Sequence, residues 1–516
     1  MSEKKSERDS QSLVRGLGLL DATMIVVGSM IGSGIFLTSA ASARLVGSPG
    51  WLLAAWAVAG LLTITGALCC AELATMMPRA GGQYVFLREA YSPAIGFLFG
   101  WSLFLVIQTG TIAAVAIGFA KFMGVLAPQI SSTSYIIEPV RVGGGYAVSL
   151  STQQFVAIVV ILFLTISNTF GLRAGKAIQN TFTFTKTAAL IGLILVGLTL
   201  GWAAGSRTGA AAFTSDWWNP VANGWTPQAA LTDFKMTGAL ALLMLLGQAM
   251  VGPLFAQSAW NNVTFTGSEV REPGRNLPRA LLIGCGLVVG LYLLANLAYV
   301  VTLPLAEIQR APQDRVATVT MQAILGAPGT ILMAVLIMVS TFGCNNGLIL
   351  AGARVYYAMA RDRLFFKAVG RVNSYHVPAV ALLAQGVWAS LLTLPRTVRP
   401  NAAPGEDPYG DVYTQLLAYI ISADLVFYVL MVAAVIVMRR KAPEAPRPYR
   451  TWGYPFVPAL YIVIALLLVL DLAYLSPQTA GIGYLIVFTG LPVYLVWRKR
   501  AALSPALETA ATEIVD

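Results

Sequence analysis

The chain has 516 residues, of which 57% are hydrophobic and 11% charged, and its formal net charge at pH 7 is +11. A soluble domain carries about a quarter charged residues, so this composition excludes a soluble globular protein. Apolar windows of about 19 residues predict instead an all-α, polytopic membrane protein with twelve spans and no soluble module.

The predicted spans set the organisation of the chain. In order, they cover approximately residues 18–43, 50–76, 93–125, 152–170, 178–201, 239–268, 281–303, 330–358, 378–396, 413–438, 454–474 and 478–497. The first 15 residues are polar and show no charged-then-apolar signal with a small-residue cleavage site, so we expect the first span to be retained.

Basic residues predict the orientation of the spans. With both termini cytoplasmic, the inner segments hold 23 Lys and Arg and the outer segments 9, if Lys121 and Arg396 at the outer ends of their spans are included, while Lys186 and Arg354 fall deeper within spans. Cytoplasmic loops are enriched in basic residues. We therefore expect a multi-pass protein of the plasma (cell inner) membrane with both termini inside. This topology accounts for the net charge, and no nucleic-acid partner is expected.

The first span contains the stretch GSMIGSGIF, residues 28–36, which is rich in glycine and serine. Gly28 and Gly32 form a GxxxG pair, which would let a neighbouring helix pack closely. Alternatively, the residues at 32–34 let the helix unwind at mid-membrane. The freed backbone groups would then have to line a protein cavity or bind a ligand.

Lys186, in the stretch FTFTKTAAL of the fifth span, lies about 12 Å inside the membrane if each residue adds about 1.5 Å. A lysine at such depth costs about 2.5–3.5 kcal/mol on insertion scales. Its side chain is too deep to reach inner water readily, so we expect an inward-facing partner.

The sixth span is interrupted by VGPLFAQSAWNN, residues 251–262. Pro253 removes an N–H and clashes with the preceding turn. Spans 1 and 6 each begin a five-span block, and paired interruptions at matching positions of two halves are typical of a transporter binding site. Half-helix amides suit an anion and freed carbonyls suit a cation, so the pair matches a zwitterion.

Asp424 lies at the midpoint of the tenth span, in YIISADLVFYV. An intramembrane acid is a functional candidate by default, and a structural pair with a basic group is the alternative. Arg354 and Glu72 lie near the inner ends of their spans. Both are interpreted as structural, and the Arg354 side chain could extend to the interface.

The remaining reactive side chains do not suggest catalysis. Cys69, Cys70, Cys285 and Cys344 all fall within predicted spans, so no disulfide-linked heavy chain and no metal site is expected. His376 is the only histidine and is interpreted as a surface loop residue, which leaves a catalytic triad little to build on. We expect neither enzymatic activity nor a cofactor. A channel is disfavoured because no ring of repeated charges is found.

Three stretches resemble signatures of the amino acid–polyamine–organocation superfamily, most closely its L-type amino acid transporter branch. They are GSMIGSGIF in span 1, AELATMMPRAGGQYVF (71–86) at the end of span 2, and LFAQSAWNNVTFTGSEVREPGRNLPRA (254–280) in and after span 6. The resemblance covers roughly spans 1–10. It implies a LeuT-like core of five spans repeated in inverted orientation, with helices 1 and 6 discontinuous, followed by two C-terminal helices.

This resemblance implies a division of the chain. The parts are a cytoplasmic N-terminal tail (1–17), a first repeat (18–205), an external loop (206–238), a second repeat (239–438), helices 11 and 12 (439–497) and a cytoplasmic C-terminal tail (498–516).

The resemblance also implies roles for residues at the two interruptions. The amides of Ser33 and Gly34 would bind the substrate carboxylate. The carbonyls of Met30, Phe255 and Ser258 would receive the α-ammonium.

The Phe255 ring would close over the substrate as a gate, together with Trp260, the family tryptophan. Ile31, Gln257, Ala259 and Asp424 complete the expected substrate-binding set. At 257–259 the chain departs from the family, which usually has an aromatic residue and two glycines there.

By the same resemblance, Lys186 takes the place where sodium-coupled relatives hold a sodium ion, and ties span 5 to spans 1 and 8. We therefore expect a sodium-independent exchanger or facilitator of L-amino acids that works by alternating access. A proton-coupled symporter, with Lys186 or Asp424 carrying the proton, is the alternative, and a non-transporting amino acid receptor is a further one. The expected partners are an amino acid substrate and the lipid bilayer, and the sequence predicts no oligomeric state.

Overall fold

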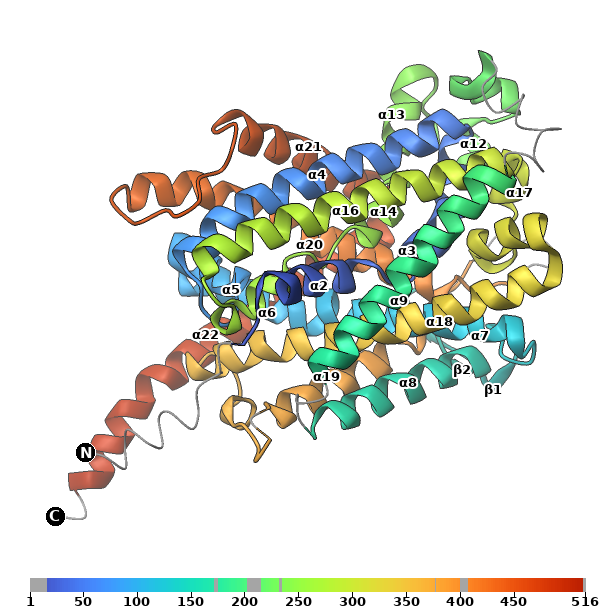
Figure 1. Cartoon of the computed structure of the whole chain (residues 1–516). Coiled ribbons are helices and arrows are strands. Elements are labelled where there is room, and N and C mark those ends of the chain that lie inside the picture. The colour runs from blue at the N-terminus through green and yellow to red at the C-terminus, as the bar shows by residue number, and fades with distance from the viewer. Residues whose placement is uncertain are drawn as a thin grey trace.

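The computed structural model describes residues 16–170, 175–201, 215–231, 234–375, 377–399 and 407–513. Long helices run side by side through one bundle, and a small sheet lies at one end of it (Figure 1). We call this the sheet end. The chain enters its first helix and leaves its last from the other end, which we call the opposite end (Figure 1).

The bounds of the elements follow the chain. The α-helices are α2 (Leu19–Met30), α3 (Gly34–Val46), α4 (Pro49–Met76), α5 (Gln83–Ala90), α6 (Pro93–Ser102), α7 (Gln108–Leu126), α8 (Thr152–Asn168), α9 (Gly175–Val196), α12 (Pro227–Ala230), α13 (Gly238–Ala249), α14 (Val251–Ala256), α15 (Asn262–Phe265), α16 (Pro273–Thr302), α17 (Leu305–Gln309), α18 (Val316–Arg361), α19 (Ala379–Leu392), α20 (Val412–Lys441), α21 (Phe456–Leu475) and α22 (Pro477–Glu513). The π-helical and 3₁₀ turns are η1 (Leu103–Ile107), η2 (Gly197–Gly201), η4 (Ser215–Trp218), η5 (Val221–Asn223), η6 (Gly267–Glu269), η7 (Pro312–Asp314) and η8 (Lys367–Gly370), and the strands are β1 (Tyr135–Gly143), β2 (Tyr146–Ser151) and β3 (Pro395–Thr397).

Apolar helices occupy all twelve predicted ranges, but they do not all have the length of a membrane span. Within the described residues, nine are long and apolar enough to cross a membrane, and α2 with α3 makes a tenth if that bent pair is one span. The other two, α8 and α19, have 17 and 14 residues. At 1.5 Å per residue they fall short of a hydrocarbon core about 30 Å thick.

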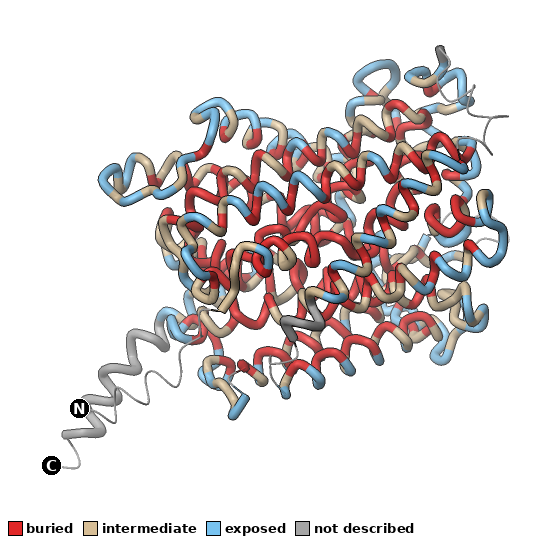
Figure 2. Tube along the Cα trace, viewed as in Figure 1, coloured by how far each residue is buried: buried red, intermediate tan, exposed pale blue. Residues whose placement is uncertain are grey.

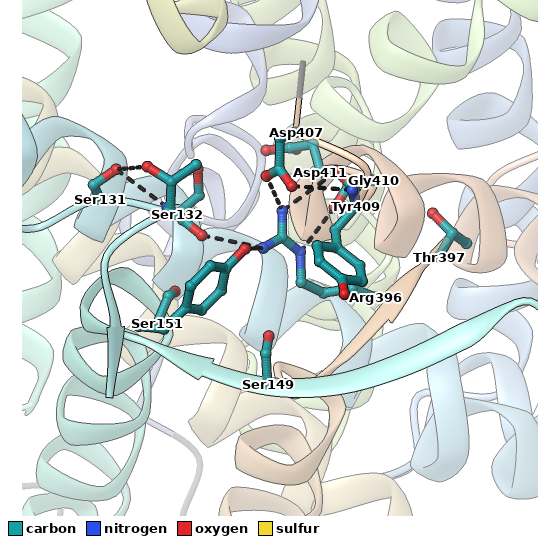
Figure 3. A network of polar contacts seen from close by, with 12 residues as sticks. Ser131, Ser132, Ser149, Ser151, Arg396, Thr397, Asp407, Tyr409, Gly410 and Asp411 are labelled. Carbon is teal, nitrogen blue, oxygen red and sulfur yellow. Dashed lines mark hydrogen bonds and ion pairs between the residues drawn. The ribbon is translucent and has the colours of Figure 1, made fainter. Parts of the chain in front are cut away.

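The sheet departs from the all-α prediction. β1, β2 and β3 form an antiparallel sheet that joins the connection before α8 to the connection between α19 and α20. A buried arginine, Arg396 of β3, fastens it (Figure 3). Its guanidinium pairs with Asp407 at 2.8 Å and donates to the Tyr135 hydroxyl at 2.6 Å and the Gly410 carbonyl at 3.1 Å. These contacts fix the chain just before α20 begins.

The core lies along the bundle axis. Buried residues line the facing sides of the helices, and exposed residues lie at the periphery and at the ends (Figure 2). α16 packs along α4 and α2, and α18 packs along α7 and α9. The short helices α2, α3 and α14 therefore lie among long helices, where unpaired backbone groups are kept from lipid.

Candidate functional site

The first predicted span is broken at its middle. α2 ends at Met30, α3 begins at Gly34, and the two helices are bent by 41°. Ile31 leaves helical geometry with a ψ of 92°. Of the two interpretations of the glycine-rich stretch, the structure has the break rather than an intact packing helix. Gly32 still packs closely, because a Cβ there would lie 3.1 Å from the Sγ of Cys344.

Lys186 finds its inward-facing partner in the backbone of this break. The side chain is fully buried, and its ammonium donates to the carbonyls of Gly28 and Ile31, the latter at 2.9 Å. Cys344 of α18 approaches the same turn, with its Sγ 3.4 Å from the Ser29 carbonyl. α9, α2 and α18, the predicted spans 5, 1 and 8, are thus joined at this point.

The backbone carbonyls of the first break have hydrogen-bond partners, whereas two of its amides do not. Tyr292 of α16 donates its hydroxyl to the Met30 carbonyl at 2.9 Å, so the four consecutive carbonyls from Gly28 to Ile31, at the end of α2 and in the break, have donors. The amides of Ser33 and Gly34, by contrast, have no acceptor among the described residues. Amides at the start of a helix such as α3 are a ready site for an anion.

Gly34 also brings the two broken spans together. A Cβ built on it would lie 2.6 Å from the Cβ of Ala256, the last residue of α14. Real Cβ atoms do not approach so closely, because interiors are packed at van der Waals contact. The first turn of α3 therefore reaches the end of α14 only because residue 34 has no side chain.

The second break separates α14, which ends at Ala256, from α15, which begins at Asn262. Ala259 within it has a φ of +64°, the left-handed region that glycine adopts without strain. The resembled family usually has a glycine at this position. The backbone conformation is thus of the kind that glycine favours, although the residue here is alanine.

The two carbonyls of this break that were expected to receive an ammonium differ. The Phe255 carbonyl already accepts from the amide and the hydroxyl of Ser258, at 3.1 Å and 2.7 Å. The Ser258 carbonyl has no donor in the part of the chain that the structure describes. Ser258 is therefore the more open acceptor of the two.

The two aromatic residues assigned to the gate contact different parts of α20. The Phe255 ring meets Tyr413 edge-on, with centroids 6.0 Å apart, and the Tyr413 hydroxyl lies 3.0 Å from the Ser33 Oγ. Trp260 instead stacks on Tyr428, with centroids 5.3 Å apart. Only Phe255 thus lies in a cluster that also includes the first break.

A small cavity lies between α4, the second break, α20 and α21. We call it the acidic cavity, and its lining includes Asp424, Gln257, Ser258, Trp260, Tyr428 and Tyr461. Asp424 is 4% exposed. Its depth was apparent from the sequence, and the structure adds that α20 turns it toward the second break.

A larger cavity lies toward the sheet end, between α3, the α13–α14 junction, η7 and the start of α20. Its lining includes Thr38, Gly252 and Tyr413. Tyr413 thus lines this cavity and also contacts Ser33 and Phe255.

An ion pair that could not be foreseen from the sequence lies beside Tyr413. Lys121 of α7 is 2% exposed, and its ammonium lies 2.8 Å from a carboxylate oxygen of Asp411 and 5.3 Å from the centre of the Tyr413 ring. Burial alone would raise the pKa of Asp411, but Lys121 and hydrogen bonds from Thr414 hold that pKa below its usual value. The only signal in the sequence was a lysine at the end of an apolar stretch.

Ion pairs also join segments near the opposite end of the bundle. Glu72 accepts from Arg439 at 2.9 Å and 2.7 Å and from the Thr451 amide at 2.7 Å, so its interpretation as a structural pair is confirmed. Arg354 is buried and lies 3.4 Å from Glu269. It is structural as expected, but its side chain is held by a buried ion pair and does not extend to an interface.

The other reactive side chains lie away from these contacts. All four cysteines are buried and free, and His376 lies outside the described residues. Among the residues described, no group of three or more potential ligands could hold a metal ion. Asp471 of α21, which sequence reasoning missed, is half-buried beside Gly247, and its Oδ2 has no hydrogen-bond partner in the described chain.

Comparison with known proteins gives consistent similarities along nearly the whole chain. The family described as "Amino acid permease" matches residues 17–496. The chain is 29% identical to the human b(0,+)-type amino acid transporter 1 over 504 residues, which cover 96% of this chain and 90% of that protein. It is 30% identical to the human large neutral amino acids transporter small subunit 2 over 492 residues, covering 94% and 81%. It is 29% identical to the serine/threonine exchanger SteT of Bacillus subtilis over 497 residues, covering 96% and 99%.

Proposed function

The chain belongs to the amino acid permease family, and from this premise we propose that it is a secondary active transporter of L-amino acids that works by alternating access. The observation that carries the proposal is the pattern of hydrogen bonds at the first break. Its carbonyls are occupied by Lys186, Cys344 and Tyr292, while the amides of Ser33 and Gly34 have no acceptor among the described residues. An anionic group of a substrate would complete it.

The proposed architecture is twelve spans, with two inverted repeats of five (18–205 and 239–438, separated by the loop 206–238) followed by two helices (439–497). Two correspondences support it. The interrupted spans are the first and sixth, and the short helices α8 and α19 fall at the fourth and ninth positions. Both pairs are separated by five, as an inverted repeat requires.

We propose that the sheet end faces outward and that both tails, 1–17 and 498–516, are cytoplasmic, in the plasma or inner cell membrane. The charge bias supports this orientation. Arg361, Arg363, Lys367 and Arg371 cluster in one connection at the opposite end, and such clusters are retained on the cytoplasmic side.

Substrate would bind across the two breaks. Its carboxylate would accept from the amides of Ser33 and Gly34, and its α-ammonium would donate to the Ser258 carbonyl, with the Met30 carbonyl as a further acceptor through its second lone pair. Phe255, packed against Tyr413, would cover the substrate from the sheet end.

Lys186 supports sodium-independent exchange or facilitated transport. Freed carbonyls in a broken helix are the groups that coordinate sodium in coupled transporters. Here the ammonium of Lys186 donates to two of them. A fixed positive charge already satisfies this site, so no sodium ion is needed there.

Counterflow tests the transport proposal directly. Purified protein in proteoliposomes loaded with unlabelled L-serine, L-leucine or L-arginine should accumulate the same labelled amino acid several-fold above liposomes that lack the protein. Binding of these amino acids without counterflow would instead indicate a receptor, and would overturn the proposed transport.

A proton-coupled symporter is the second candidate, because Asp424 is buried at mid-membrane and forms no ion pair within the described chain. Under this alternative, external acid stimulates uptake, and Asp424→Asn erases the stimulation while sparing exchange. Uptake that does not respond to external acid in the wild type would exclude it.

A further inference from the structure

The acidic cavity contains a carboxylate without a counter-charge. The buried basic side chains near the two breaks have other partners: Lys121 pairs with Asp411, Arg354 with Glu269, and Lys186 with backbone carbonyls. No lysine or arginine of the described chain pairs with Asp424. A carboxylate without a cationic partner is costly at this depth, so a cation that enters the cavity would be stabilised.

A second acceptor lines the same cavity. The amide nitrogen of Gln257 donates to the Trp56 carbonyl at 3.2 Å, which fixes the orientation of the amide. Its Oε1 is buried and has no donor in the described chain. Gln257 is 1% exposed, so water cannot freely satisfy this oxygen. A ligand with several N–H donors would supply what the oxygen lacks.

The remaining wall is aromatic. Trp260 and Tyr428 stack with an interplanar angle of 16°, and Tyr461 completes this side of the cavity. Aromatic faces attract ammonium and guanidinium groups, by about 2 kcal/mol or more when the site is desolvated. A carboxylate, an unpaired amide oxygen and aromatic rings together form a site for a cation, and they offer nothing comparable to an anion.

The place of the cavity indicates which part of a substrate would reach it. Gln257 and Ser258 belong both to the cavity and to the second break. Asp424 follows Tyr413, which contacts Ser33, by eleven residues of α20, or about 16 Å of helix rise. A substrate held at both breaks would therefore need a long side chain to bring its end to Asp424.

We propose that the acidic cavity is the side-chain subsite for cationic L-amino acids, in which Asp424 pairs with the terminal guanidinium or ammonium group. The inference rests on the proposed function, because the breaks must hold the α-amino and carboxylate groups. It names a substrate class that the breaks alone do not select.

L-Arginine and L-citrulline separate charge from shape, because they have nearly the same size and differ in the charge of the terminal group. In counterflow with wild-type protein, we expect labelled L-arginine to be preferred over L-citrulline at least about tenfold in apparent affinity, equivalent to about 1.4 kcal/mol. In Asp424→Asn we expect that preference to fall to within about twofold.

Two further variants control for folding and for general effects of membrane carboxylates. Asp424→Glu retains the charge and should retain a preference for L-arginine. Asp471→Asn removes a membrane aspartate that is absent from the cavity lining and should leave the ratio unchanged. An Asp424→Asn protein that kept the full arginine preference would overturn the subsite.

The wild-type measurement also separates the two proposals. If neutral amino acids exchange but L-arginine is bound no better than L-citrulline, the subsite is wrong and the proposed transport stands. If none of L-serine, L-leucine, L-arginine and L-citrulline exchanges, both proposals are overturned.

Discussion

The ammonium of Lys186 donates to the carbonyl of Ile31 at 2.9 Å, although the two residues are 155 positions apart in the chain. This contact places a fixed cation on the unwound backbone of the first span, where carbonyls without donors would be costly.

Replacement of sodium by choline should therefore leave amino acid exchange unchanged, because the Lys186 ammonium already fills the cation position. The measurement is initial uptake in proteoliposomes at equal ionic strength and pH. A steep dependence on sodium concentration would refute this role of Lys186.

Lys186→Met should destabilise the protein by about 3 kcal/mol, because two hydrogen bonds from a charged donor are lost and two buried carbonyls lose a donor. Exchange should fall below about a tenth of the wild-type rate. Thermal unfolding in detergent and counterflow measure the two effects.

Thr185→Ala is the matched control for Lys186→Met. Thr185 is the preceding residue, only partly buried, and its hydroxyl bonds within its own helix. Its removal should change stability by less than about 0.5 kcal/mol. Equal losses in the two variants would mean that the effect of Lys186→Met belongs to α9 in general and not to the break.

Gly34→Ala should weaken substrate binding and lower stability, since the new Cβ would lie 2.6 Å from the Cβ of Ala256 and push the two breaks apart. Gly34→Leu should abolish binding as well as transport. Substrate-induced thermal stabilisation of the purified protein measures the binding.

Gly192→Ala provides the control for the glycine substitution, because nothing lies within 4 Å of a Cβ at that position of α9. It should leave binding intact and could raise stability by up to about 1 kcal/mol through helix propensity. Near wild-type affinity in a folded Gly34→Leu protein would contradict the proposal that the Ser33 and Gly34 amides bind the substrate carboxylate.

Lys121→Met should destabilise the protein by about 2 kcal/mol, because it leaves the charge of Asp411 partly buried without its partner. The loss stays below that of a fully buried pair since the Asp411 side chain is 29% exposed. The double variant Lys121→Met/Asp411→Asn should recover most of the stability, and a double variant no more stable than the single one would contradict the pairing.

The pH dependence of this pair has a defined sign. The folded-state pKa of Asp411 is held below its usual value of 3.8, so the pair contributes stability above that value and loses it as pH falls through the lower folded pKa. Between pH 5 and 8 its contribution should be constant. Unfolding temperatures of wild type and Asp411→Asn should therefore differ by the same amount across that window.

The breaks and the buried lysine could be predicted from the sequence because their signals are local. Gly32, Gly34 and Pro253 weaken helices in otherwise apolar stretches, and Lys186 stands out as a charge at membrane depth. The depth of Asp424 could be read in the same way, but the direction of its side chain could not, because it depends on how α20 packs.

Contacts between distant segments left no such signal. Ser33 and Tyr413 are 380 positions apart, and neither residue type indicates the other. The left-handed conformation of Ala259 was hidden because alanine does not mark a positive φ. The sheet was missed because β1 and β2 lie in a connection between predicted spans, and because β3 has only three residues and begins inside the predicted ninth span.

α20 contains neither glycine nor proline along its 30 residues. It begins just after the ion pair of Arg396 and Asp407, and its last turn contains Arg439. It therefore has no internal hinge, in contrast to the two broken spans that it contacts. A tilt that parts Asp411 from Lys121 at one end must displace Arg439 relative to Glu72 at the other. The two ion pairs lie about 40 Å apart along α20, and this unbroken helix links them mechanically across the thickness of the membrane.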